Sequence, residues 1–210
     1  MGFLKTAKDV EPRREITRKS PVFADSRLIV TLSLVLALCF SERAFAESAG
    51  AQDVSEYQVK AAFLYNFAKF VEWPGAAEPS PDGFFVIGIL GKDPFGSTLD
   101  LLVKTKTAMG RHIEVKRFAR VEDVHGCQML FISASEARKL PATIKALNGM
   151  SVLTVSEVPQ FLGAGGMLNL VLAGNRVAFE ANPRAAEHEG FRLSSKLLQL
   201  AVNLRGAPQP

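Results

Sequence analysis

Two uninterrupted apolar runs of strand length constrain the fold of this 210-residue chain more than any other feature. Phe84–Leu90 (FFVIGIL) and Cys127–Ile132 (CQMLFI) are each expected to form a strand that is covered on both faces. Residues 112–118 alternate in polarity and predict a strand nearer an edge, and residues 151–155 predict a short strand. Because helix-permissive stretches separate these runs, the order predicts βαβ units and a largely parallel sheet. The intervening helices are expected at residues 94–105 and 133–147.

A hairpin and two helices are expected to close the fold. Met167–Ala173 and Arg176–Ala181 flank Gly174-Asn175, a dipeptide that favours a hairpin turn. Asn182-Pro183 predicts the start of a short helix, and a leucine stripe over residues 193–204 predicts a final one. The expected fold class is therefore α/β: a single-domain layered sandwich with a mixed, mostly parallel sheet, flanking helices and a C-terminal β-hairpin.

The stretch Tyr57–Pro74 (YQVKAAFLYNFAKFVEWP) precedes the first strand and predicts a helix that runs from residue 53 to Trp73. Pro74 blocks its continuation. On a helical projection, the apolar arc is wider than that of an ordinary surface helix. Its members are Tyr57, Val59, Ala61, Phe63, Leu64, Phe67, Ala68, Phe70 and Val71. We therefore expect most of this helix to be enclosed by its own domain or by a partner.

A narrower face of the same helix carries the candidate partner-binding surface, which comprises Tyr65, Lys69, Glu72 and Trp73. Tyrosine and tryptophan are enriched in binding hot spots. Lys60 falls inside the apolar arc and is expected to support this surface from within. Glu56 lies one turn earlier, which suits an i,i+4 ion pair. A lysine that extends its ammonium group to solvent is the alternative explanation.

The first 46 residues predict an export signal. A charged segment precedes the uncharged run Leu28–Phe40, and Ala44-Phe45-Ala46 has small residues where signal peptidase cleaves. The run has 13 residues, fewer than the roughly 18 that a membrane span needs, with an uncleaved anchor as the alternative. We expect residues 1–46 to be a signal peptide, cleaved after Ala46, and residues 47–210 to form one domain. The length of the charged segment also leaves a later translation start open.

Net charge and cysteine content limit the classes of function that the sequence allows. Cleavage would remove 8 of the 25 basic and 5 of the 21 acidic residues, which leaves a domain of net charge near +1. The sequence of this domain has no basic patch that would indicate nucleic-acid binding. Cys127 would be the one remaining cysteine, so an internal disulfide is excluded. Its apolar surroundings predict a buried structural thiol, with a reactive or intermolecular thiol as the alternative.

Patterns for catalysis or metal binding are missing from the sequence. His112, His125 and His188 are scattered, and there is no HxxxH, CxxC or GxSxG. Residues 163–166 (GAGG) lie between a helix and a strand, whereas a phosphate-binding loop lies between a strand and a helix. We interpret them as a helix end and a turn. Neither enzymatic activity nor a cofactor is expected.

Small polar residues follow the predicted parallel strands. In an open parallel sheet, ligands bind outside the carboxyl ends of the strands. The candidate ligand-binding residues at these ends are Gly91, Lys92, Asp93, Ser133, Ser135 and Ser156. Helix capping explains the same residues without a ligand.

Several motifs, in a single order, resemble the YfiR-like family of periplasmic proteins. The first is YQVKAAFLYNFAKFVEWP itself. The others are IGILGKDPFG (87–96), CQMLFISASE (127–136), LTVSE (153–157), FEAN (179–182) and LSSKLL (193–198).

The resemblance implies a small periplasmic α/β protein, without enzymatic activity, that tends to form a homodimer. It also implies binding to the periplasmic sensor region of an inner-membrane diguanylate cyclase of the YfiN type. The bound repressor would hold the cyclase inactive, and its release would raise cyclic di-GMP and favour biofilm. Relatives tune this response with disulfides, a route that the single mature cysteine, Cys127, does not offer internally. A periplasmic small-ligand sensor or carrier is the alternative function.

Overall fold

The computed structural model describes residues 56–74 and 83–205. The predicted signal peptide, its cleavage point after Ala46 and the predicted helix start near residue 53 lie outside these residues. The described part contains a first helix at residues 56–70, four further α-helices, and strands that lie between and beside them in the chain. The later helices are α2 (Ser97–Val103), α3 (Leu140–Leu147), α4 (Pro183–His188) and α5 (Ser195–Leu200).

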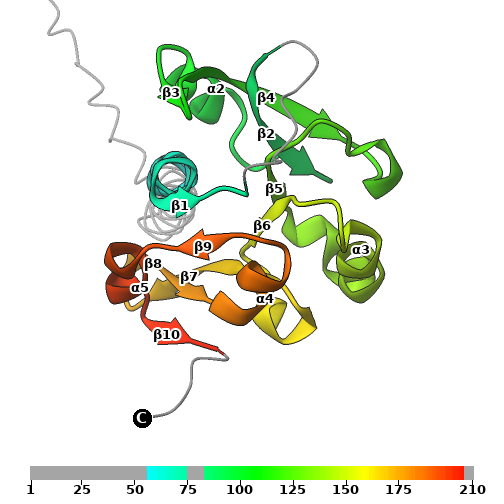
Figure 1. Ribbon diagram of the computed structural model, residues 1–210, viewed down its shortest axis with the longest axis vertical. Coiled ribbons are helices and arrows are strands. Elements are labelled where there is room, and N and C mark those ends of the chain that lie inside the picture. The colour runs from blue at the N-terminus through cyan, green and yellow to red at the C-terminus, as the bar shows by residue number, and fades with distance from the viewer. Residues whose placement is uncertain (1–55, 75–82, 206–210) are drawn as a thin grey trace, which may run out of the picture. The chain divides into compact units, whose positions relative to one another are not determined.

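An eight-stranded sheet forms the centre of the fold (Figure 1). Its strands are β2 (Phe85–Leu90), β3 (Thr107–Ala108), β4 (Arg111–Phe118), β5 (Met129–Ile132), β6 (Leu153–Ser156), β7 (Leu168–Ala173), β8 (Arg176–Ala181) and β10 (Asn203–Leu204). Their spatial order is β10-β8-β7-β6-β5-β2-β4-β3. A separate antiparallel pair joins β1 (Val71–Glu72) to β9 (Arg192–Leu193).

Strand directions confirm the predicted α/β class. The pairs β4–β2, β2–β5, β5–β6 and β6–β7 are parallel, as expected for strands joined by crossovers. Strands β7 and β8 form the predicted antiparallel hairpin around Gly174 and Asn175. The sheet is therefore mixed and mostly parallel.

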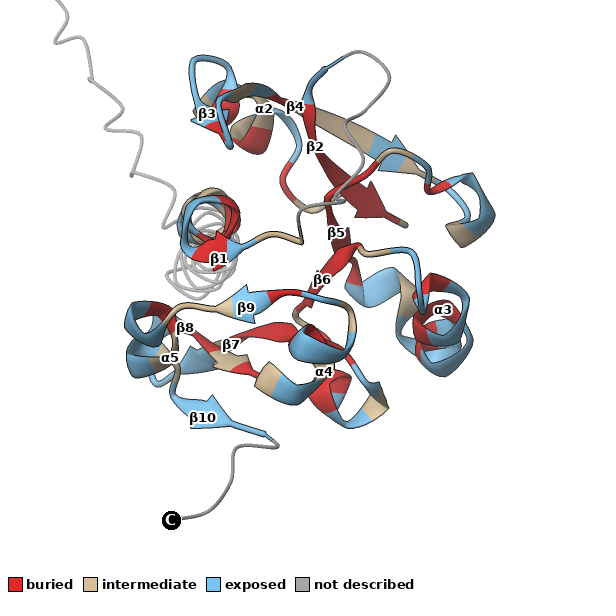
Figure 2. Ribbon diagram, in the orientation of Figure 1, coloured by how far each residue is buried: buried red, intermediate tan, exposed pale blue. Residues whose placement is uncertain are grey.

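The side chains of the central strands alternate between two hydrophobic cores. On β2, Phe85, Ile87 and Ile89 face one core, and Val86 and Leu90 face the other. The first helix, α2 and α5 cover the first core, whereas α3 and the 3₁₀-helix η3 (Phe161–Ala164) cover the second. Figure 2 shows β2, β5 and β6 buried along their whole length. Burial on both faces explains why β2 and β5 are apolar without alternation, whereas β6 also buries the polar residues Thr154 and Ser156.

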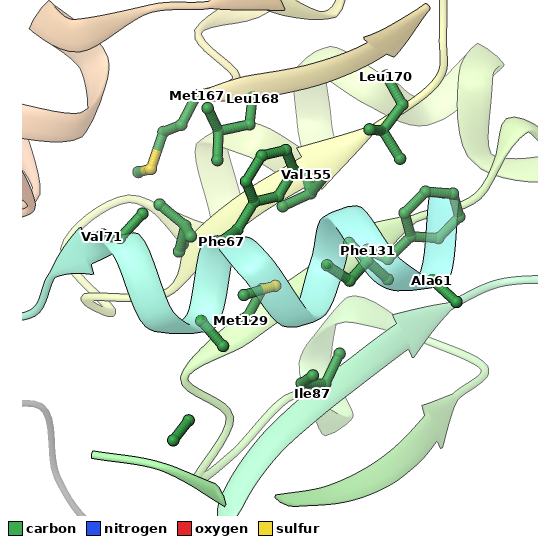
Figure 3. Packing of buried hydrophobic residues seen from close by; sticks show 14 of the residues in the cluster. Ala61, Phe67, Val71, Ile87, Met129, Phe131, Val155, Met167, Leu168 and Leu170 are labelled. Carbon is green, nitrogen blue, oxygen red and sulfur yellow. The ribbon is translucent and has the colours of Figure 1, made fainter. Parts of the chain in front are cut away.

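The first helix lies across the sheet and buries one stripe of side chains. Ala61, Leu64, Phe67 and Ala68 are at most 1% exposed. Figure 3 shows Ala61, Phe67 and Val71 directed at residues of β2, β5, β6 and β7. The helix is thus a central part of the first core, as its apolar sequence predicts.

Two predictions about this helix are wrong in detail. It ends at residue 70 rather than at Trp73, because Pro74 disfavours helical backbone at the preceding residue and β9 pairs with Val71–Glu72 instead. The buried arc is also narrower than predicted, since Val59 and Phe70 are each 43% exposed. The helix is half enclosed and carries a partly apolar outer face.

Two other predicted helices are shorter than expected. The stretch 133–147 splits into the 3₁₀-helix η2 (Ala134–Lys139) and α3, with Pro141 in the first turn of α3. The C-terminal helix α5 ends at Leu200, because the next residues join the sheet as β10. There the Val202 amide donates to the Phe179 carbonyl and the Arg205 amide to the Ala181 carbonyl. Residues 203–204, which the leucine pattern predicted to be helical, therefore pair with β8 as a strand.

Candidate functional site

The carboxyl ends of the parallel strands meet where the chain order of the sheet reverses. Strand β2 lies between β4 and β5, so the chain leaves β2 for β4 on one side and later returns to β5 on the other. This switch point is where open α/β sheets bind ligands. Gly91–Asp93 follow β2, Ser133 follows β5, and Ser156 ends β6. The structure therefore brings the predicted ligand-binding residues to one edge.

Most of these small polar residues contact one another. The Lys92 amide donates to Ser135 Oγ at 2.9 Å, and the Ser135 amide donates to Ser133 Oγ at 3.3 Å. Ser156 Oγ donates to the Ile132 carbonyl at 2.7 Å. Gly91 has φ of +88°, and a Cβ there would lie 2.4 Å from Ser135 Oγ. These contacts hold the loops at the strand ends together.

Asp93 is held by its own loop and by β4. Its Oδ1 accepts hydrogen bonds from the Phe95 and Gly96 amides at 2.7 and 3.3 Å. Its Oδ2 accepts from Arg117 Nε at 3.0 Å, and Arg117 also binds Asp100. The hydrogen bond from Arg117 lowers the pKa of the Asp100 carboxyl below its ordinary value. Asp93 and Arg117 thus join the loop after β2 to the end of β4.

Lys60 lies at the centre of a buried charge network at the same edge. It is 5% exposed, and its Nζ lies 2.5 Å from a carboxylate oxygen of both Glu56 and Glu157. Tyr57 donates its hydroxyl to Glu157 at 3.0 Å. Its ring lies under Lys60 Nζ at 4.5 Å from the centroid and packs edge-on against Phe95. The ammonium group is therefore paired inside the fold and does not extend to solvent.

The charges around Lys60 decide its protonation. Burial by itself lowers the pKa of this ammonium group, but the hydrogen bonds and charges of Glu157 and Glu56 outweigh that effect. The pKa of Lys60 is consequently raised above its ordinary value. Glu157 immediately follows β6, so the network ties the first helix to the carboxyl end of a central strand.

Trp73 and Glu72 have separate environments. The Trp73 indole donates to the Ala68 carbonyl at 3.2 Å and packs edge-on against Phe85 and Phe191, with centroids 5.0 and 5.4 Å away. Glu72 is exposed and lies 3.8 Å from Arg192 across the β1–β9 pair. Trp73 therefore contributes to the first core, while Glu72 lies at the surface.

Tyr65 and Lys69 form the exposed part of the predicted surface. Lys69 Nζ lies 5.6 Å from the centroid of the partly buried Tyr65 ring and 5.8 Å from that of Phe70. Lys106, from the turn after α2, lies 5.7 Å from the same Tyr65 ring. The structure therefore separates the predicted partner-binding set into Lys60 and Trp73, which point inward, and Tyr65, Lys69 and Glu72, which remain accessible.

Sequence reasoning missed four residues of these clusters: Phe70, Lys106, Arg117 and Glu157. Glu157 had a usable signal, because an acid directly after a buried strand is placed at the carboxyl edge of the sheet. Phe70 had been assigned to the core arc. Lys106 and Arg117 had no local signal, because both reach their partners through tertiary contacts.

Cys127 is buried, as its apolar surroundings predict. Its Sγ lies 2.9 Å from the Met129 carbonyl oxygen, and desolvation raises the pKa of the thiol to about 12. A Cβ on Gly88 would lie 2.8 Å from this sulfur. The thiol is therefore protonated at neutral pH, which makes it a poor nucleophile.

Within residues 56–74 and 83–205, no group of three or more potential ligands could hold a metal ion. In the same part of the chain, no helix is both long and apolar enough to cross a bilayer.

The fold and these clusters define an α/β domain with a braced first helix and an accessible aromatic surface on it. Residues 57–202 match the YfiR/HmsC-like family, and the chain belongs to this family. The family consists of periplasmic regulators of cyclic di-GMP signalling, and enzymatic activity is not known among them. The match begins at Tyr57, so it includes Tyr57, Lys60 and Glu157 of the charge network and the outer face of the first helix.

Two solved structures show limited similarity to this fold. A conserved domain protein from Vibrio cholerae O1 biovar El Tor aligns with 13% identity and a TM-score of 0.43. The ABC domain from Streptococcus pneumoniae in complex with L-Trp aligns with 9% identity and a TM-score of 0.44. Each alignment covers 61% of this chain and 57% of the other chain.

Proposed function

We propose that this protein represses a membrane-anchored diguanylate cyclase by binding the periplasmic sensor region of that enzyme. Repression would lower cyclic di-GMP and restrain biofilm formation. In this proposal, the signal peptide is cleaved after Ala46, and residues 47–210 act in the periplasm as a binding domain without catalytic activity. Family membership supports the signalling role.

The observation that supports this proposal is the exposure of apolar side chains on the outer face of the first helix. Val59 and Phe70 are each 43% exposed, and Tyr65 and Lys69 lie on the same helix with Tyr65 partly buried. Exposed apolar side chains that are rimmed by charge mark interaction sites on proteins. Tyrosine is among the residues that dominate binding energy in interfaces. The helix thus offers a contact surface in addition to its contribution to the core.

Both ends of the helix are fixed to the domain. Near its start, Lys60 pairs with Glu157 beyond β6. Just after its end, the β1–β9 pair and the Trp73 ring hold the chain against Phe85 and Phe191. A surface on a fixed element loses little conformational entropy on binding, so it suits a specific protein contact.

A binding assay tests the partner and the surface separately. The purified domain, residues 47–210, is titrated against the periplasmic region of a membrane protein with a GGDEF domain encoded beside this gene. We expect binding by the native domain and a loss of about 10-fold or more for Tyr65→Ala with Phe70→Ala. The matched control is Leu101→Ala with Leu200→Ala, two leucines that are 69% and 71% exposed on α2 and α5.

The outcomes are distinct. Absence of binding by the native domain would contradict the cyclase as partner. Equal binding by the double variant and the native domain would contradict the surface. Homodimer formation belongs to the same proposal, and sedimentation velocity of the native domain measures it directly.

A periplasmic small-ligand sensor or carrier is the second candidate. The observation in its favour is a cavity of about 220 Å³ between α3 and α4, with Ile144, Met167 and Glu189 among its lining residues. This cavity lies away from the strand carboxyl ends predicted from sequence. A ligand at 100 times its dissociation constant stabilises a protein by about 2.7 kcal/mol, which a thermal-shift screen of nucleotides and amino acids detects. Loss of the shift in Lys92→Ala would indicate the strand ends, and loss in Glu189→Gln the cavity.

A further inference from the structure

Two lysines from different elements converge on one tyrosine ring. Lys69 lies on the first helix, and Lys106 lies in the turn between α2 and β3. Their Nζ atoms are 5.6 and 5.7 Å from the centroid of Tyr65. Phe70 adjoins them, with its ring 5.8 Å from Lys69 Nζ. We call Tyr65, Lys69, Phe70 and Lys106 the cationic–aromatic patch.

The positive charges of this patch are not neutralised within the described part of the protein. Among residues 56–74 and 83–205, neither Lys69 nor Lys106 forms an ion pair, and the Tyr65 hydroxyl forms no hydrogen bond. Acids close to them in sequence pair elsewhere, since Glu72 faces Arg192 and Asp100 binds Arg117. Within the described residues, the patch therefore holds two like charges beside one ring without a counter-charge.

This arrangement suits a carboxylate from another molecule. Two ammonium groups on one ring repel each other, and an anion placed between them relieves the repulsion. The ring and the 43% exposed Phe70 also offer apolar surface beside the charges. An aromatic surface with a charged rim is typical of protein interfaces.

We propose that the cationic–aromatic patch binds an acidic segment of the protein partner, with carboxylates on Lys69 and Lys106 and an apolar side chain on Tyr65 and Phe70. The inference rests on the proposed function, because it specifies the chemistry of the partner at the same surface. It predicts that the docking segment of the cyclase's periplasmic region carries clustered Asp or Glu beside an apolar residue.

A protein segment fits better than a lipid surface. Attraction to anionic lipids needs clusters of roughly four to eight basic residues. The patch has two lysines, and the exposed Glu72 lies three residues from Lys69 on the chain. The domain left after signal cleavage has a net charge near +1. These features favour a local charge match over general attraction to a membrane.

Charge reversal tests the inference in the binding assay described above. The variant Lys69→Glu with Lys106→Glu should weaken binding to the cyclase's periplasmic region by about 10-fold or more and reduce the salt dependence of binding. The matched control, Lys145→Glu with Lys196→Glu, changes net charge equally at exposed positions of α3 and α5. All four lysines are exposed, so both variants should fold, which thermal melts verify.

The two proposals fail differently. If the native domain binds and the Lys69/Lys106 variant binds equally well, the acidic-segment inference is overturned and the proposed function stands. If the native domain does not bind the cyclase region, the proposed function fails. The inference is then decided by an NMR titration with a blocked glutamate-rich peptide that contains phenylalanine.

In that titration, the amides of Tyr65 and Lys106 should shift with the native domain and not with the charge-reversed variant. Absence of shifts at millimolar peptide would overturn the inference. Vesicles containing phosphatidylglycerol provide the final comparison. Binding to vesicles but not to the peptide, lost on charge reversal, would assign the patch to a membrane and also overturn it.

Discussion

Lys60 and Lys69 lie nine residues apart on the same helix and have opposite environments. Lys60 is buried between the carboxylates of Glu56 and Glu157. Lys69 is exposed, lies over the rings of Tyr65 and Phe70, and has no carboxylate partner among the described residues. The inward lysine is satisfied by its own fold, whereas the outward lysine leaves a charge available to a partner.

The same contrast separates the aromatic residues of this segment. Trp73 packs against Phe85 and Phe191 in the first core. Tyr65 is only partly buried and carries two cations on its ring. One short segment therefore combines an inward set, Lys60 and Trp73, with an outward set, Tyr65, Lys69 and Phe70. The inward set should control stability, and the outward set should control binding.

Loss of the Trp73 ring should give the largest effect on stability. Trp73→Ala removes two edge-on aromatic contacts and a hydrogen bond to Ala68, so the free energy of unfolding should fall by about 3 kcal/mol. Tyr65→Ala is the matched outward control and should lower the free energy of unfolding by about 1 kcal/mol. Urea denaturation of residues 47–210 measures both. Equal losses would remove the distinction between the two sets.

Removal of Glu157 should give the next largest effect. Glu157→Ala leaves the buried Lys60 with the Glu56 carboxylate and removes one hydrogen-bond acceptor of the Tyr57 hydroxyl. We expect a loss of about 2 kcal/mol, below the usual cost of breaking a buried pair because one carboxylate remains. The control is Glu72→Ala, which removes an exposed carboxylate and should change stability by less than about 0.5 kcal/mol. A smaller loss of stability for Glu157→Ala than for the control would show that the Lys60–Glu157 pair does not stabilise the fold.

Alkaline pH should weaken the contribution of Lys60 selectively. Its pKa in the folded domain is raised above the ordinary value of 10.5, so its stabilising effect is complete below pH 10.5. The effect is lost as the pH rises through the raised pKa. The stability difference between the native domain and Lys60→Gln should therefore be constant from pH 7 to 10 and decrease above that. A difference that falls already near neutral pH would show that the carboxylates do not hold the charge.

Neutralisation of the outward lysine should have the smallest effect on stability. Lys69→Gln keeps a flexible polar side chain, one atom shorter than lysine, and removes a charge that no described carboxylate balances. The free energy of unfolding should change by less than about 0.5 kcal/mol, while affinity for the acidic partner should drop several-fold. Urea denaturation measures the free energy of unfolding and a binding titration measures the affinity, both on the same protein sample. Destabilisation above 1 kcal/mol would place Lys69 with the inward set.

Sequence patterns predicted the sheet better than the helices. The runs of β2 and β5 were recognised because strands buried on both faces have continuous apolar sequence. The hairpin of β7 and β8 was recognised from its turn residues. Helix lengths were overestimated at Trp73 and at Leu204, because a strand edge competed for the backbone in both places.

The candidate sites were predicted in part. The residues Gly91–Asp93, Ser133 and Ser156 were expected at one edge of the sheet, and the structure places them there, with most of their polar groups bonded to neighbouring loops. Their role in ligand binding stays a prediction, as does the role of the partner-binding surface. Local periodicity assigned Trp73 to the open face, because a helical projection has no information on where a helix ends.

The sequence by itself determined the fold class, the two-sided burial of the central strands and the family. These depend on local composition and chain order, which a sequence displays directly. Only the tertiary structure decided that Glu157 braces Lys60 and that Lys106 joins Lys69 on Tyr65. Those partners are 97 and 37 residues apart in the chain, and packing of the first helix on the sheet brings them together. The pairing of Lys60 with Glu157 and the approach of Lys106 to Tyr65 are therefore tertiary contacts, which the helical periodicity of the first helix does not encode.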